Sequence, residues 1–109
     1  MREKLATYSL AMGHDVGGPK AYLFKQLLGI RLAEIDHLEA EIRRGALGEP
    51  VSRVWEIPYG QRCQVLIPVR GVGIHQATVM VVTTGWLLRY VGDRPRLVTA
   101  YIKGERATA

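Results

Sequence analysis

The spacing of the apolar residues changes once along the chain, at Gly48-Glu49-Pro50. Before this point apolar residues recur at the spacing of helices, and after it they alternate with polar residues as in half-buried strands. This order predicts an α+β fold, with N-terminal helices packed on one face of a four-stranded antiparallel β-meander. A chain of 109 residues has room for one hydrophobic core. We therefore expect a single domain, with a helical half at about 1–48 and a sheet half at about 51–103.

Three helices are expected in the first half, over residues 3–12, 19–28 and 32–44. Glycine adopts the left-handed backbone that ends many helices at little cost. Gly29 is therefore expected to end the second helix, and Gly45 to cap the third.

Four strands are expected in the second half, over residues 51–58, 61–69, 77–90 and 97–102. Short turns separate them, which favours antiparallel neighbours. In the last strand, alternation predicts that one face meets the helices and the other faces away. The first face is made of Val98, Ala100 and Ile102, and the second of Leu97, Thr99 and Tyr101.

The formal net charge of +5 lies entirely in the sheet half. Residues 1–49 carry seven basic and seven acidic side chains, whereas residues 50–109 carry eight basic and three acidic ones. Seven of those eight cations are arginine, whose planar guanidinium is suited to phosphate. Charge alone leaves two interpretations open, a solvated basic surface and a sheet that binds a polyanion.

Several functional classes are not expected from this sequence. The single cysteine, Cys63, forms no internal disulfide or multi-cysteine zinc site, so a reducing, cytoplasmic location fits best. No apolar run is long enough to cross a membrane, and the first residues lack the features of a secretory signal. No metal-ligand spacing, phosphate-binding loop or dinucleotide fingerprint is present, so we expect no metal and no cofactor.

The histidines differ in what they suggest. His37 is expected to be an exposed helix residue, and His75 a surface residue after a glycine-rich turn. His14 lies in a glycine-rich segment just before a predicted helix N-terminus, where unpaired N–H groups favour anions. Two interpretations of this segment are open. In one, His14 and Lys20 hold and protonate a phosphate; in the other, the segment is only a capping loop.

Two stretches resemble a bacterial domain family of unknown function. The run His14-Asp15-Val16-Gly17-Gly18-Pro19-Lys20-Ala21-Tyr22-Leu23-Phe24 is similar to that family's opening, His-Pro-x-Gly-x-x-Lys-Ala-x-Phe-Phe. The segment Trp86-Leu87-Leu88 and the end Pro95-Arg96-Leu97-Val98-Thr99-Ala100-Tyr101 are similar to its close. Asp15 and Ile102 depart from the pattern, because proline is common at both positions. Such toxin-associated domains resemble the barnase–EndoU–colicin–RelE class of metal-independent ribonucleases.

The resemblance implies cleavage of RNA by attack of a ribose 2′-hydroxyl on the adjacent phosphorus. It implies a catalytic set made of His14, Lys20, Arg96, Thr99 and Tyr101. His14 would be the acid or base, because its ordinary pKa lies near neutrality. Additional phosphate contacts are expected from Arg62, Arg89 and Arg94.

Two alternatives remain at this level. The same fold fits a nucleic-acid-binding module that does not cut, with a steep salt dependence and no products. It also fits a protein-interaction module with an acidic partner, such as an antitoxin or immunity protein. The sequence gives no oligomeric state.

Overall fold

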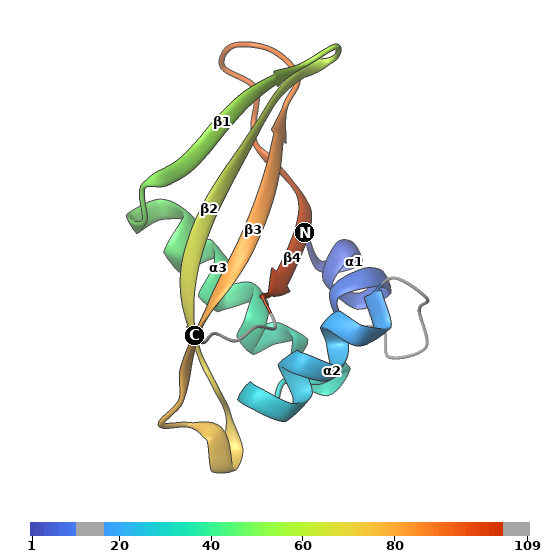
Figure 1. Cartoon of the computed structure of the whole chain (residues 1–109), viewed down its shortest axis with the longest axis vertical. Helices are drawn as coiled ribbons and strands as arrows, with labels where there is room; N and C mark the ends of the chain where they lie inside the picture. The colour runs from blue at the N-terminus through green and yellow to red at the C-terminus, as the bar shows by residue number, and fades with distance from the viewer. Residues whose placement is uncertain (11–16, 104–109) are drawn as a thin grey trace.

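The computed structural model describes residues 1–10 and 17–103. It confirms the predicted order of helices followed by strands (Figure 1). The helical elements are α1 (Arg2–Lys4), the π-helical turn η1 (Leu5–Ser9), α2 (Gly17–Leu28), the 3₁₀ turn η2 (Leu32–Glu34) and α3 (Ile35–Gly48). The sheet elements are β1 (Val51–Ile57), β2 (Gly60–Arg70), the 3₁₀ turn η3 (Gly73–His75), β3 (Val79–Leu88) and β4 (Arg96–Ile102).

The strands form one antiparallel sheet in the order β1-β2-β3-β4, as a meander requires. The buried core joins the helices to alternate strand residues, with Phe24 and Leu28 of α2 and Ile42 of α3 belonging to the same cluster as Ile67 of β2. Helices α1 and α2 lie beside β4 (Figure 1). The Ser9 hydroxyl donates to the Ala100 carbonyl at 2.8 Å, so η1 closes this edge of the sheet. No helix within the described ranges is long and apolar enough to cross a membrane.

The third helix does not end where the sequence predicts. Gly29 has φ +67° and ends α2 as expected, but Gly45 is not among the glycines with positive φ and lies inside α3. A Cβ built on Gly45 would lie 2.2 Å from Cγ2 of Ile67. Gly45 therefore allows α3 to approach β2 closely, and the prediction of a cap there was wrong.

An irregularity in β4 changes which of its residues face the helices. The register with β3 shifts between Gly85 and Trp86, so that Gly85 pairs with Thr99 but Trp86 pairs with Leu97. An extra residue in one strand reverses the alternation beyond it. Leu97 is consequently buried in the core together with Ala100 and Ile102, and its prediction for the opposite face was wrong.

Two side chains of α3 hold the end of β2. β1 stops pairing at Val51, opposite Val65, so β2 continues beyond its neighbour. At the far end, Oε1 of buried Glu41 accepts the Arg70 N–H at 2.9 Å. The Arg70 carbonyl accepts from Nε2 of His37 at 2.6 Å. His37, predicted to be exposed, is partly buried because it makes this bond.

Glu41 makes part of the stability dependent on pH. Arg44, 2.6 Å away, lowers the pKa of the Glu41 carboxyl through its hydrogen bond, against the opposing effect of burial. Since the folded pKa lies below the unfolded one, this contribution is complete above the ordinary value of about 4.3 and is lost as the pH falls through the folded value. We expect Glu41→Gln to lower the free energy of unfolding by about 1–2 kcal/mol at neutral pH and by much less near pH 3.

Urea denaturation at the two pH values measures this difference. Glu39→Gln is the matched control, because Glu39 lies on the same helix and pairs with the exposed Arg43 at 3.3 Å. Its effect should be about 0.5 kcal/mol at neutral pH. An equal loss for Glu41→Gln at both pH values would contradict the assignment.

Candidate nucleic-acid interface

The side of the sheet that points away from α3, here called the open face, carries alternate side chains of all four strands. On β2, Val65 and Ile67 point into the core, so that Arg62, Gln64 and Leu66 belong to the open face. Cross-strand pairing extends these positions into three rows, Trp55–Arg62–Leu87–Arg96, Gln64–Gly85–Thr99 and Leu66–Thr83–Tyr101. Of the predicted site residues, Arg62, Arg96, Thr99 and Tyr101 therefore share one surface.

The first row contains an aromatic ring flanked by two cations. Trp55 is 36% exposed. The guanidinium carbons of Arg53 and Arg62 lie 5.1 and 5.7 Å from the centre of its ring. Both distances are within the range of cation–π attraction, about 6 Å. A ring beside guanidinium groups offers a stacking surface for a base and charge for the neighbouring phosphates.

Gly85 gives Arg62 the room to reach across β3. A Cβ on Gly85 would lie 2.9 Å from Cγ2 of Thr99 and 3.3 Å from a terminal guanidinium nitrogen of Arg62. The Nε atom of Arg62 is buried and has no hydrogen-bond partner among the described residues. A buried donor without an acceptor costs about 1–3 kcal/mol.

Lys20 joins the open face from α2. Its Nζ atom lies 4.7 Å from the centre of the Tyr101 ring. The two residues are 81 positions apart in the sequence and come together because α2 packs along β4. Lys20, Thr99 and Tyr101, predicted as members of one site, are thus brought together by the fold.

The remaining predicted residues lie elsewhere. Arg94 lines a hollow that also contains core residues, among them Val65 and Leu97. Arg89 is engaged by Asp93, whose carboxylate accepts its backbone N–H at 2.8 Å and lies 3.4 Å from its Nε. His14 lies outside the described residues.

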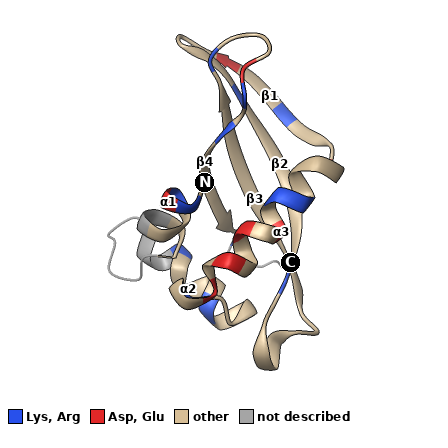
Figure 2. Ribbon diagram, turned by 180° about the vertical axis from the view of Figure 1, so that it is seen from behind, with Lys and Arg blue, Asp and Glu red and all other residues tan. Residues whose placement is uncertain are grey.

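Acidic and basic residues occupy different stretches of α3. Figure 2 shows acidic residues along the first part of α3 and basic residues on the strands and on the last part of α3. Within 1–10 and 17–103, no three His, Cys, Asp or Glu side chains are grouped as metal ligands would be.

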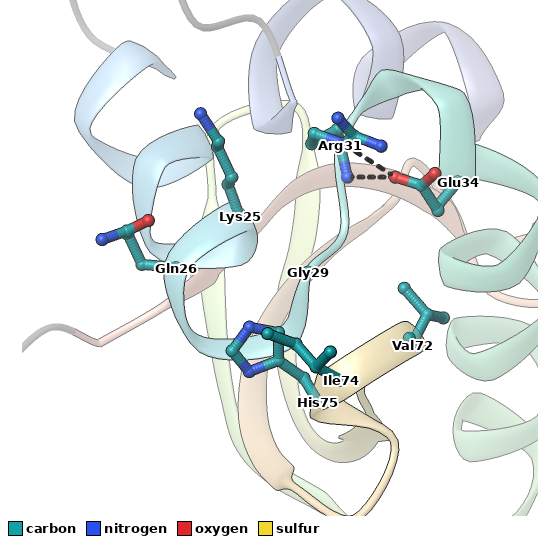
Figure 3. A pocket seen from close by; sticks show the side chains of 9 residues that line it. Lys25, Gln26, Gly29, Arg31, Glu34, Val72, Ile74 and His75 are labelled. Carbon is teal, nitrogen blue, oxygen red and sulfur yellow. Dashed lines mark hydrogen bonds and ion pairs between the residues drawn. The ribbon is translucent and has the colours of Figure 1, made fainter.

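A hollow of about 520 Å³ lies between the end of α2 and the η3 turn (Figure 3). It does not suit phosphate. Arg31 is occupied by Glu34, whose carboxylate accepts its backbone N–H at 2.9 Å and pairs with its side chain at 3.4 Å. His75, predicted at the surface, is partly buried there and lies against Gly29. The last carbonyl groups of α2 disfavour an anion at this end of the helix.

Sequence reasoning missed Arg53, Trp55 and Gly85. The alternation predicted for residues 51–58 already placed Arg53 and Trp55 on one face of a strand. They form a candidate binding surface only because Arg62 lies opposite Trp55. That pairing depends on the register of β1 and β2, which the sequence does not show. Nothing in the sequence marked Gly85, because its role is to leave room for the side chains of Arg62 and Thr99.

Comparison with known proteins gives one match. Residues 1–104 match the profile of a family described as "Domain of unknown function (DUF6883)". No curated protein and no solved structure matches the chain.

Proposed function

The chain belongs to the DUF6883 family of domains of unknown function, and we propose that this member binds single-stranded RNA on the open face of its sheet. The observation that carries the proposal is the Trp55 ring with Arg53 and Arg62 against it.

The shape of the surface favours a single strand over a duplex. The major groove of B-DNA admits a helix or a two-stranded ribbon, and a four-stranded sheet is wider than either. Single strands, in contrast, spread their unstacked bases over sheet faces that carry aromatic and arginine side chains. The Thr99 and Tyr101 hydroxyl groups are suited to contact the ribose 2′-hydroxyl, which distinguishes RNA from DNA. A cytoplasmic location, for which the lone Cys63 argues, would give access to RNA.

Fluorescence anisotropy with a labelled single-stranded RNA tests the binding. With about three phosphate contacts, the logarithm of the affinity should fall with the logarithm of the salt concentration with a slope of about −2. Duplex RNA and single-stranded DNA of the same sequence are the controls and should bind more weakly. A salt-independent affinity, or equal binding of all three, would overturn the proposal.

Cleavage of the bound strand is a second candidate function, favoured by the position of Lys20 against Tyr101. The 2′-hydroxyl would attack phosphorus and lose its proton to a base, while the 5′-oxygen leaves and gains a proton. The products are a 2′,3′-cyclic phosphate and a 5′-hydroxyl. Lys20 would stabilise the phosphorane charge, and Thr99 would donate a hydrogen bond. His14, six positions before Lys20 in the sequence, is the proposed acid or base.

Incubation of RNA with the protein in EDTA, followed by end-group analysis, tests the chemistry. Cyclic phosphate ends that disappear with His14→Ala would support cleavage, and a toxin role would add growth arrest relieved by an acidic partner protein. Intact RNA at high protein concentration, with binding retained, would leave the non-catalytic binding function.

A further inference from the structure

The opposite side of the sheet has a hollow of its own, of about 850 Å³. The strands extend beyond α3 (Figure 1), and the hollow lies between the end of that helix, the first residue of β1 and the turn before β4. Its lining includes Val65, Trp86 and Leu97, which belong to the core. At its rim, Leu47 is 92% exposed. An apolar surface of this kind is typical of a ligand site.

The polar side chains of the hollow are nearly all cationic. Arg43, Arg94 and Arg96 line it, and no acidic residue does. The side chain of Arg96 belongs to the open face, because Arg96 pairs with Leu87. Arg43 pairs with Glu39 at 3.3 Å, whereas no ion pair within the described residues involves Arg94. The Trp86 indole N–H is already donated to the Thr84 hydroxyl at 2.8 Å. The hollow therefore offers hydrocarbon contact and arginine donors, and little else.

From this combination we propose that the hollow binds an amphipathic monocarboxylate, with its hydrocarbon chain on Val65, Trp86 and Leu97 and its carboxylate on Arg94. The apolar area supplies most of the affinity, because each buried methylene contributes about 0.8 kcal/mol in general. The arginines select an anion over an alcohol of the same length. The size of the hollow falls in the range of small-molecule sites, about 300–1,000 Å³. This inference is independent of the RNA-binding proposal, which concerns the other face.

Cys63 provides the readout, because it lines the hollow and is the only cysteine in the chain. Burial raises the pKa of its thiol, against a smaller opposing effect of Arg62. Alkylation by N-ethylmaleimide should therefore be slow, and mass spectrometry of the intact protein gives its rate. Bound ligand should slow it further by covering the sulfur.

The probe is monomeric decanoate, with decanol as the uncharged control of equal length. We expect decanoate to protect Cys63 to saturation, and decanol to need about tenfold more for the same protection. Arg94→Ala should raise the half-protecting concentration of decanoate about tenfold, and Arg94→Lys should restore part of the protection. Arg53→Ala, an arginine of the open face, should leave protection unchanged.

Three results would overturn the proposal. They are no protection by decanoate, equal protection by decanol, and an Arg94→Ala variant that unfolds at the same urea concentration as the original chain but retains full protection. Protection by vesicles of an acidic phospholipid without protection by decanoate would assign the surface to membranes instead. RNA affinity measured on Arg94→Ala should not change, so the two proposals can fail separately.

Discussion

Replacing Gly45 with alanine should lower the free energy of unfolding by about 2–3 kcal/mol, although alanine is the better helix former. Inside a helix, the exchange of glycine for alanine ordinarily gains about 1 kcal/mol. Here the added methyl group would stand 2.2 Å from Cγ2 of Ile67, a fully buried side chain. Either α3 moves away from β2 or Ile67 leaves its rotamer. Overpacking of this kind costs about 1–3 kcal/mol, in addition to cancelling the gain in helix propensity. Urea denaturation followed by circular dichroism measures the change.

Gly48→Ala is the matched control. Gly48 lies in the same helix, and a Cβ placed there would meet nothing within 4 Å. Its substitution should be neutral or slightly stabilising. The double variant Gly45→Ala/Ile67→Ala should lose less stability than the sum of the single ones, because truncation of Ile67 removes the clash. Gly45→Ala as stable as Gly48→Ala would mean that α3 does not approach β2 as described.

Replacing Arg62 with alanine should weaken single-stranded RNA binding about thirtyfold. The change removes a phosphate contact and one of the two guanidinium groups against Trp55, and stacking contacts of this kind contribute about 1–3 kcal/mol. The salt slope should also become shallower by about 0.7, the amount expected for one phosphate contact on a single strand. Anisotropy titrations at several salt concentrations give both quantities.

Two further variants separate charge from stacking. Arg62→Lys keeps the charge but loses the planar group, so the salt slope should persist while the affinity falls. Arg94→Ala removes an arginine that lines the hollow on the other side of the sheet and should leave RNA affinity nearly unchanged. Equal losses for Arg62→Ala and Arg94→Ala would show that binding follows net charge and not the open face.

Periodicity was sufficient to predict the succession of helices and strands, because each element shows its own spacing of apolar residues. It was insufficient wherever two elements meet. Gly45 looked like a helix end, since the closeness of Ile67 is a property of packing. The position of Leu97 depended on one extra residue in β4, and alternation has no means of showing where a bulge falls.

The candidate site, too, could be predicted from the sequence only in part. Thr99 and Tyr101 were placed on one face by alternation alone, and the fold adds Lys20 to them. Arg96, grouped with them through the family resemblance, lies on the same face because it pairs with Leu87. Trp55 and Gly85 became significant only through cross-strand neighbours, which depend on register.

The way α3 holds the end of β2 has a consequence for how molecules of this protein meet one another. A strand that extends beyond its neighbour exposes unpaired backbone N–H and C=O groups, to which a strand of another molecule can pair. Repeated pairing of this kind leads to fibrils. In this stretch Pro68 has no N–H to offer. At Arg70, both backbone groups are already taken by Glu41 and His37. These three side chains therefore protect the overhanging end of β2 against polymerisation, in addition to stabilising the fold.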